Sequence, residues 1–488
     1  MRKDFLAFDL GAESGRAMRA SLSGGVITLA EVYRFPNGPV RDNGSLRWDI
    51  YRLWREMQSA LGRCSDAPLE SVGVDAWGCD YGLLRADGSL VEVPFAYRDG
   101  RTQGVMEHVF ETCSRERIYA ATGIQFLWFN TLYQLYAACK KAPHTIAAAH
   151  RFATIPDILN YWLSGTLSAE YTNATTTQCV DAVKRTWATD LLDELGIPTR
   201  LLPEIVEPGT VLGPLRKEAD RALAGVPIVT PACHDTGSAF AAVPVGNAAA
   251  FLSSGTWSLL GTELPGPIIT PRAMELDFTN EGGVCATTRL LKNIGGLWLL
   301  QSCRNSWAAT GRDYAYDELV VAAASEAPFQ ALLDPDSAGF RNPDDMVMAI
   351  DGFCRQTGQP SLDGPPSYSR AIMESLAFKY RAVLESLEEL TGKRFEEIRV
   401  VGGGARNCLL NQFTADATGR TVIAGPVEAT ALGNVAMQML ATGAVSSLRE
   451  ARAIIDRSFP VERFEPADTD RWEPHYHRFL EYLEFTCA

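Results

Sequence analysis

The chain has 488 residues, of which 46% are hydrophobic and 21% charged, with a formal net charge of −14. This length exceeds the roughly 250–300 residues at which a single core stops growing, so we expect two domains. Nucleic acids and anionic membranes are bound by clustered basic residues, and the acidic balance argues against both as partners. The eleven dispersed cysteines, without a C-x-x-C pair, are typical of reduced thiols in the cytoplasm.

Neither a signal peptide nor a membrane span is expected. Asp4 and Asp9 interrupt the first apolar run, and no later stretch is apolar enough to cross a bilayer. The sequence leaves open whether the chain is a monomer or a dimer.

The first half begins with a predicted meander of three strands, a helix and a fourth strand. The strands are expected at Phe5–Leu10, Arg16–Leu22, Val26–Phe35 and Ser71–Asp75. Apolar residues at helical spacing predict the helix between Ile50 and Leu61, and Asp87-Gly88 predicts a hairpin turn. This order differs from a Rossmann opening and is typical of a ribonuclease H-like half.

The second half repeats this order. The strands are expected at Ala248–Leu252, Trp257–Thr262, Ile398–Val401 and Thr421–Ala424. Helices are expected from Ile372 to about Gly392, from about Asn407, from about Glu428, and in the aromatic stretch after Val461. The domain boundary is predicted near Val243–Asn247.

The first motif runs from Asp9 to Arg16, directly after the first strand. Gly11 and Gly15 would let backbone N–H groups approach an anion, and Arg16 could pair with phosphate oxygens. Asp9 could hold Mg²⁺ through water. Taken alone, the same residues also fit a plain hairpin turn, and Glu13 would repel phosphates unless it pairs.

Two further loops follow strands of the second half. Ser253–Ser258 could offer hydroxyls and amides to a phosphate, although a polar hairpin loop explains it as well. Val400–Asn407 contains three glycines between a strand and a helix, which would let the backbone lie against a nucleotide. A lone triple glycine is a weak signal, which the preceding apolar strand strengthens.

The fourth motif, Pro231–Ser238, follows an apolar run at the end of the first half. Asp235 could act as a general base for a substrate hydroxyl. His234 could bind a metal, but no second ligand lies at a suitable spacing, so a simple hydrogen-bonded role is favoured. An aspartic protease would need a second Asp-Thr-Gly triad or a homodimer of small subunits, and this chain has one copy at its length. Walker, protein-kinase, G-x-S-x-G and H-E-x-x-H motifs are absent from the sequence.

In this order, the four motifs resemble those of the FGGY family of carbohydrate kinases, which has the actin-like ATPase fold. The resemblance implies an α/β protein of two ribonuclease H-like domains with a cleft between them. It implies an N-terminal domain at 1–245 with the sugar site and the base, a nucleotide-binding domain at 246–460, and a helical segment at 461–488 that packs back.

Longer segments resemble the rhamnulokinase branch of that family. They include Asp75–Asp80, Tyr97–Asp99, Gly123–Phe126, Phe129–Leu135, Glu170–Gln178, Leu252–Leu259, Asn280–Gly283, Lys292–Ile294, Gly296–Gln301 and Gly425–Ala429. This resemblance implies transfer of the γ-phosphoryl group of ATP, with Mg²⁺, to the 1-hydroxyl of L-rhamnulose in L-rhamnose breakdown.

The resemblance also implies residue roles. Asp235 would be the base, and the sugar contacts would be Gly78, His234, Asp235, Thr236 and Asn293. The ATP contacts would be Ala12, Glu13, Ser14, Gly15, Arg16, Thr256, Gln301 and Gly403. Trp77 is a candidate aromatic platform for the sugar, with a core position equally plausible.

Three alternatives stay open at this point. Another ketose kinase of the family, such as an L-fuculokinase, would share the motifs. An actin-like or heat-shock-like ATPase would share the nucleotide loops but has no need of the His234–Thr236 and Trp77-Gly78 segments. A catalytically dead sugar sensor is disfavoured because Asp9, Asp235 and Thr256 are present.

Overall fold

The computed structural model describes residues 2–66, 68–244, 249–341 and 343–487, with no side chains described beyond residue 483. The chain forms two compact units. Unit 1 joins Met1–Pro244, Glu263–Leu290 and Ala429–Phe459, and unit 2 joins Val245–Thr262, Leu291–Glu428 and Pro460–Ala488. Residues 245–247 of the predicted boundary lie outside the described residues. The division into 1–245, 246–460 and 461–488 follows continuous ranges and stays a prediction.

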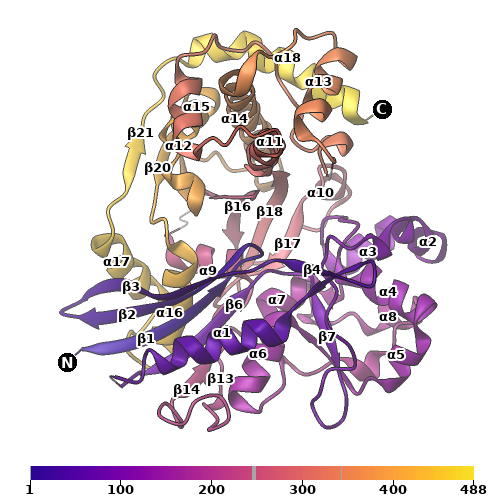
Figure 1. Cartoon of the computed structure of the whole chain (residues 1–488), viewed down its shortest axis with the longest axis vertical. Helices are drawn as coiled ribbons and strands as arrows, with labels where there is room; N and C mark the ends of the chain where they lie inside the picture. Colours follow the sequence, from indigo (N-terminus) through magenta and orange to yellow (C-terminus); the bar gives the residue numbers. More distant parts are fainter. Residues whose placement is uncertain (1, 67, 245–248, 342, 488) are drawn as a thin grey trace. The chain divides into compact units, whose positions relative to one another are not determined.

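A six-stranded mixed sheet organises unit 1, with the order β13-β14-β6-β1-β2-β3 (Figure 1). Its strands are β1 (Lys3–Leu10), β2 (Ser14–Ser23), β3 (Val26–Pro36), β6 (Ser71–Ala76), β13 (Val211–Pro214) and β14 (Pro227–Val229). β1, β2 and β3 form the antiparallel meander, whereas β6 is parallel to both β1 and β14. The carboxyl ends of β1, β6 and β14 therefore meet at one edge of the sheet.

Helices cover both faces of this sheet. Leu6, Phe8 and Leu10 of β1 share a core with α1 (Ile50–Gly62) and α6 (Ile155–Ser164). The opposite face meets α16 (Ala429–Ala441), whose Gln438 donates its Nε2–H to the carbonyl of Leu6 at 3.0 Å. Because strand residues alternate between faces, Asp9 and Asp75 point toward the α16 side.

The helices α16 and α9 (Asp235–Ala242) cross very closely. A Cβ atom at Gly433 of α16 would lie 1.7 Å from the carbonyl oxygen of Ser238 in α9. Only a glycine allows this approach. The segment after α16 continues as α17 (Leu448–Ser458), and Ser458 accepts a hydrogen bond from the backbone N–H of Ile27 at 3.0 Å.

The rest of unit 1 contains a second core of aromatic and aliphatic side chains from β7, β8 and the helices α2, α3, α4, α5 and α8, and a smaller cluster around Tyr171. Its helices are α2 (Val105–Thr112), α3 (Arg115–Thr122), α4 (Thr131–Lys141), α5 (Pro143–Ala148), α7 (Tyr171–Thr176), α8 (Thr189–Glu194) and α10 (Pro271–Glu275). Its strands are β4 (Pro39–Asp42), β5 (Ser45–Trp48), β7 (Tyr81–Leu84), β8 (Arg151–Thr154), β9 (Ala169–Glu170), β10 (Val180–Asp181), β11 (Thr186–Trp187), β12 (Ile205–Val206) and β17 (Thr279–Gly282).

Unit 2 repeats the same strand pattern, with the order β18-β16-β15-β19-β20-β21. The strands are β15 (Ala249–Ser254), β16 (Trp257–Leu264), β18 (Thr288–Gly295), β19 (Glu397–Val401), β20 (Thr421–Ala424) and β21 (Glu462–Phe464). β15 pairs antiparallel with β16 and parallel with β19, which is parallel to β20. The carboxyl ends of β15, β19 and β20 thus share one edge.

The long helix α14 (Gly364–Thr391) is central to the helices of unit 2. The others are α11 (Trp298–Ala309), α12 (Tyr316–Ala324), α13 (Met346–Gln356), α15 (Cys408–Thr418) and α18 (Thr469–Cys487). Trp472 of α18 packs against Phe378 of α14 and Phe413 of α15, with ring centroids 4.9 Å and 5.2 Å apart. The aromatic C-terminal stretch is therefore a helix that packs on unit 2.

Most predicted elements are confirmed to within a few residues. Ala248, the predicted start of one strand, lies outside the described residues. The predicted hairpin around Asp87-Gly88 forms, with the N–H of Arg85 donating to the carbonyl of Ser89 at 2.8 Å and the N–H of Val91 to that of Leu83 at 2.7 Å. The longer ladder of β7, however, is with β8. Long-range pairing with β8 prevails because β8 contributes a full four-residue ladder. No helix of the described residues is long and apolar enough to cross a membrane.

Candidate active site

The carboxyl edge of the unit 1 sheet gathers the predicted residues of the first half. Asp9 is the penultimate residue of β1. Trp77 and Gly78 follow β6, and His234 and Asp235 follow β14. A bridge between Ala76 and His234, with the N–H of Ala76 donating to the carbonyl of Cys233 at 2.9 Å, ties the last two segments together. Residues distant in sequence thus share one edge, as expected for a ligand site in a sheet with parallel strands.

The loop from Asp9 to Arg16 is a tight, fixed turn. The N–H of Gly11 donates to the carbonyl of Ser14 at 2.9 Å, and Asn37 donates to the carbonyl of Gly11 at 2.7 Å. Arg16, opposite Asp9 in the β1–β2 register, forms an ion pair with its carboxylate. This pairing turns Arg16 toward the strand end where Asp9 lies.

Gly15 and Glu13 differ in their surroundings within this loop. A Cβ atom at Gly15 would lie 2.3 Å from the ring of Phe35, so packing alone requires a glycine there. Glu13 is exposed, while Ala12 and Ser14 are half-buried. The charge of Glu13 is therefore solvated and does not have to be neutralised inside the protein.

Asp75 lies beside Asp9 on the neighbouring parallel strand. Its side chain is fully buried, and Asn434 of α16 donates its Nδ2–H to one carboxylate oxygen at 2.6 Å. Burial, together with the negative charge of Asp9, raises the pKa of Asp75 well above its ordinary value. The protonated form of Asp75 is therefore favoured more than that of an exposed aspartate.

Trp77 is a core residue in the structure. It is 5% exposed, and its indole N–H donates to Oδ2 of Asp80 at 2.9 Å. Trp48 donates to the same oxygen at 2.6 Å, and the two indole rings lie 4.2 Å apart. These contacts favour the core interpretation of Trp77 over the sugar platform. Gly78 next to it is half-buried, and Thr176 leaves no room for a side chain there.

Asp235 is the first residue of α9, and His234 is its N-cap. The carboxylate thus lies at the positive end of the helix dipole, which stabilises a negative charge. Its Oδ1 receives the backbone N–H of Thr236 at 2.6 Å and the hydroxyl of Thr236 at 3.1 Å, and Nε2 of His234 lies 3.4 Å away. The side chain is 32% exposed, and no described residue donates a hydrogen bond to Oδ2.

A buried glutamate supports the backbone before Asp235. Glu170 accepts hydrogen bonds from the N–H of Cys233 at 2.9 Å and from the N–H and hydroxyl of Thr172 at 2.9 and 2.6 Å. Burial raises the pKa of Glu170 to about 7, despite these donors. The hydrogen bond from Cys233 to Glu170 thereby fixes the backbone that leads into the His234–Thr236 turn.

The second set of predicted residues meets at the carboxyl edge of the unit 2 sheet. Ser253 and Val401 are register partners in β15 and β19, so the loop containing Thr256 and the loop containing Gly403 are neighbours. The first turn of α11, which carries Gln301, is tied to the first loop because the N–H of Trp298 donates to the carbonyl of Thr256 at 3.1 Å. Thr256, Gln301 and Gly403 therefore lie on one edge.

Asn293 lies half-buried in β18, close to the end of that strand. The backbone passes the Thr256 loop directly afterwards, since a Cβ atom at Gly296 would lie 2.7 Å from the carbonyl oxygen of Gly255. Asn293 is therefore on a strand that leads to the same edge as the predicted nucleotide residues.

The glycines of the Gly402–Gly404 loop have different roles. Gly402 has a φ of +80°, and Gly404 is buried against Ser254. Gly403 is exposed, and a Cβ atom there would meet no protein atom within 4 Å. The backbone at Gly403 is therefore open to close approach from solvent, which a side chain would hinder.

The donor set at Asp9 fits a magnesium ion. The described residues contain no group of three or more His, Cys, Asp or Glu side chains able to hold a metal. Mg²⁺ commonly keeps several waters and uses one or two carboxylates together with substrate phosphates. One carboxylate near a strand end, beside the glycine-containing loop Gly11–Arg16, is consistent with this preference.

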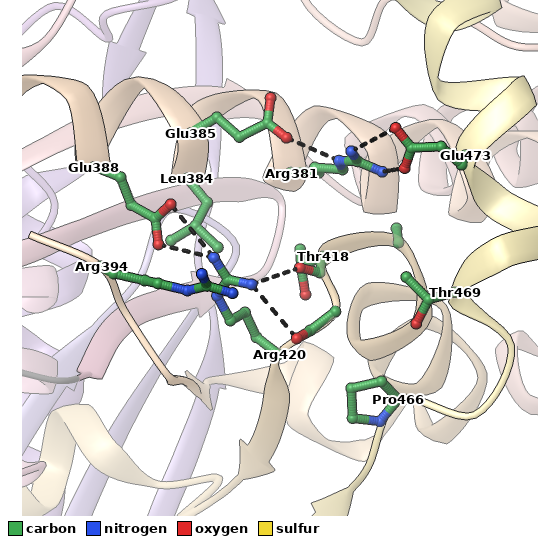
Figure 2. Close-up of a pocket in the computed structure, with 12 residues that line it drawn as sticks. Arg381, Leu384, Glu385, Glu388, Arg394, Thr418, Arg420, Pro466, Thr469 and Glu473 are labelled. Atoms are coloured by element: carbon green, nitrogen blue, oxygen red, sulfur yellow. Dashed lines mark hydrogen bonds and ion pairs between the residues drawn. The ribbon is translucent and has the colours of Figure 1, made fainter.

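A separate pocket of about 430 Å³ lies in unit 2 (Figure 2). Arg381, Arg420 and Arg394 line it together with three glutamates. Arg381 forms ion pairs with Glu385 and Glu473, and Arg420 pairs with Glu388. The charges balance, and none of the predicted site residues lines this pocket. It contributes nothing to the candidate site.

The sequence did not single out several residues that shape the site. Asn434 reaches Asp75 from a helix far along the chain, while Glu281 and Arg289 surround His234. No local motif marks such contacts, because they depend on tertiary packing. Among these residues, only Glu281 lies in a segment on which the family resemblance is based, as does Asp75, the partner of Asn434.

Comparison with known proteins agrees with this architecture. Models of the N-terminal and C-terminal domains of the FGGY family of carbohydrate kinases match residues 5–242 and 250–442. A rhamnulokinase of Bacteroides thetaiotaomicron is 43% identical over 98% of this chain and 99% of its own length. A rhamnulokinase of Pectobacterium carotovorum is 42% identical, over 98% and 96%.

Solved structures share the fold at much lower identity. The gluconate kinase of Lactobacillus acidophilus gives a TM-score of 0.83 at 16% identity, covering 100% of this chain and 99% of its own. A ligand-bound xylulose kinase of the same organism gives the same values. The two-domain actin-like ATPase fold is therefore confirmed. The chain belongs to the FGGY family of carbohydrate kinases, and within it to the rhamnulokinase branch.

Proposed function

We propose that this kinase transfers the γ-phosphoryl group of ATP to the 1-hydroxyl of L-rhamnulose, giving L-rhamnulose 1-phosphate in L-rhamnose catabolism. Membership of a kinase family implies ATP as the co-substrate. The rhamnulokinase relatives support the sugar, because they match nearly the whole chain. A cytoplasmic location is proposed with it, supported by the free thiols of the described cysteines.

The observation that carries the proposal is the position of Asp235. Its Oδ1 accepts two hydrogen bonds from Thr236 and lies 3.4 Å from Nε2 of His234, while no described residue donates a hydrogen bond to Oδ2. A base must lie within hydrogen-bond reach of the proton that it removes, and a partly exposed carboxylate oxygen can do so. As the sugar oxygen bonds to the γ-phosphorus, Oδ2 takes the hydroxyl proton and ADP leaves.

The remaining unit 1 residues would orient the two substrates. Gly78, His234 and Thr236 would contact the sugar, with Asn293 of unit 2. Phosphoryl transfer depends mainly on positioning and charge stabilisation. Backbone N–H groups of the Ala12–Arg16 loop would therefore meet the phosphates of ATP.

The residues of unit 2 would bind the rest of the nucleotide. Thr256 and Gln301 would contact ATP, and Gly403 would lie against its adenosine part. Mg²⁺, held by Asp9 through water, would neutralise charge on the phosphates.

A panel of L-ketoses tests this function. ATP consumption is measured with purified enzyme, Mg²⁺ and either L-rhamnulose, L-fuculose, L-xylulose or no sugar. We expect the largest kcat/KM with L-rhamnulose and hardly any turnover without sugar. A preference for L-fuculose would assign the chain to the alternative ketose kinase, and sugar-independent turnover would contradict both.

A further inference from the structure

Both ring nitrogens of His234 have charged neighbours. Nε2 lies 3.4 Å from Oδ1 of Asp235. Nδ1 lies 3.2 Å from Nη2 of Arg289 and 3.2 Å from Oε2 of Glu281. The imidazole ring of His234 therefore lies between Asp235 on one side and Glu281 of β17 and Arg289 of β18 on the other.

Glu281 and Arg289 form a buried ion pair. Arg289 is 1% exposed, and its Nη2 lies 3.1 Å from Oε2 of Glu281. Its Nε–H donates to the carbonyl of Gly282 at 2.8 Å. Burial raises the pKa of Glu281, but the positive charge of Arg289 and the contact with His234 outweigh it, so that the pKa is lowered. Glu281 is thus ionised beside a guanidinium that keeps its charge.

This pair determines which nitrogen of His234 carries the proton. A guanidinium can only donate, so the hydrogen bond from Arg289 needs a lone pair on Nδ1. Oε2 of Glu281 has no hydrogen-bond partner within the described residues, so its contact with the ring is electrostatic. Neutral His234 must then carry its proton on Nε2, which faces Asp235.

We propose that Arg289 is a positioning residue for the reaction. By donating to Nδ1 it fixes the Nε2–H tautomer of His234, so that this N–H faces the negative charge of Oδ1 of Asp235 at 3.4 Å. Oδ2 then faces the acceptor hydroxyl. The opposite tautomer would place a nitrogen lone pair against the carboxylate and repel it. This inference rests on the proposed function in one respect, the assignment of Asp235 as the base.

The tautomer can be measured directly in the wild-type enzyme. ¹⁵N NMR of protein labelled at its six histidines distinguishes protonated from unprotonated ring nitrogens, and His234→Gln identifies the signal of His234. At pH 8 we expect a protonated Nε2 and an unprotonated Nδ1. A protonated Nδ1, alone or in an imidazolium ion, overturns the proposal.

Substitution of Arg289 tests the consequence for turnover. In Arg289→Met, Glu281 is the charged neighbour of Nδ1 that remains among the described residues, and it should draw the proton there, so that the tautomer reverses. Because a small misplacement of a reacting group can cost about 10²-fold, kcat should fall by roughly ten- to a hundredfold. The KM for MgATP should stay unchanged. Wild-type kcat with a reversed tautomer would overturn the proposal.

A second variant covers the case that Arg289→Met does not fold. Glu281→Leu with Arg289→Met removes both charges together and leaves no buried charge unpaired. We expect a mixture of tautomers and a lowered kcat, whereas a wild-type tautomer and kcat would overturn the role of Arg289. The wild-type spectrum needs no substrate. If the enzyme does not phosphorylate L-rhamnulose but His234 carries its proton on Nε2, only the proposed function is refuted. If the enzyme phosphorylates L-rhamnulose while His234 carries its proton on Nδ1, only the positioning role of Arg289 is refuted.

Discussion

Gly404 lies directly against the side chain of Ser254, where a Cβ atom at residue 404 would come within 2.0 Å of the serine Oγ. The neighbouring Gly403 has no protein atom within 4 Å of the equivalent position. The two adjacent glycines thus have different structural roles. Gly404 lets two loops of the unit 2 sheet touch, and Gly403 leaves a surface open.

Gly403→Val should therefore weaken nucleotide binding without unfolding the enzyme. We expect the KM for MgATP to rise at least about tenfold, since a branched side chain would occupy the surface that the backbone offers. The KM for L-rhamnulose should change little. Steady-state kinetics with each substrate varied in turn would show this, and Gly404→Ala, which should lower the melting temperature instead, is the matched control. An unchanged KM for MgATP in folded Gly403→Val would contradict the nucleotide role.

Much of the fold could be predicted because its signals are local. The alternating strand from Phe5 to Leu10 and the helical stripe of α14 each follow from the spacing of apolar residues. The meander, helix and parallel strand then suffice for a ribonuclease H-like half. The pairing of β7 with β8 could not be predicted, because register partners such as Tyr81 and Thr154 lie far apart in sequence.

The site could be predicted only where glycine, acid and hydroxyl residues follow strands. Asp9 and Asp235 stand out for that reason. The residues that contact the neighbours of Asp9 and Asp235 come from other elements, since Asn434 donates to Asp75 and Arg289 contacts His234. Trp77 shows the reverse case, since nothing local revealed that its indole N–H is satisfied by Asp80.

Gly433→Ala should destabilise unit 1 at the crossing of α9 and α16. The added methyl group would clash with the carbonyl oxygen of Ser238, and overpacking of this kind typically costs about 1–3 kcal/mol. Gly352→Ala in α13, where a Cβ atom meets open space, is the control and should stabilise by up to about 1 kcal/mol. Urea unfolding of both variants would measure this, and equal stability of Gly433→Ala and wild type would contradict the close crossing.

Asp80 should make stability fall as pH rises. Burial raises its pKa to about 6, although Trp48 and Trp77 donate to it. The folded state therefore binds a proton that the unfolded state has lost, between the unfolded pKa of about 4 and the folded pKa. The contribution of Asp80 to the free energy of unfolding is fully present below about pH 4. It decreases by about 3 kcal/mol up to pH 6, at about 1.4 kcal/mol per pH unit.

Asp80→Asn should remove that slope. The difference in free energy of unfolding between variant and wild type is followed by urea denaturation from pH 4 to pH 7. We expect the variant to become more stable relative to wild type as pH rises. Parallel curves for the two proteins would show that Asp80 keeps an ordinary pKa.

The most direct measurement compares Asp235→Asn with wild type on L-rhamnulose. The amide keeps the size and an acceptor oxygen but cannot take the hydroxyl proton. General-base catalysis contributes about 10²–10⁴-fold, so kcat should fall by that order, while the calorimetric dissociation constant for the sugar should move much less. Asp190→Asn, at an exposed position on α8, should retain wild-type kcat as a control. If folded Asp235→Asn keeps more than about a tenth of wild-type kcat, Asp235 is not the base.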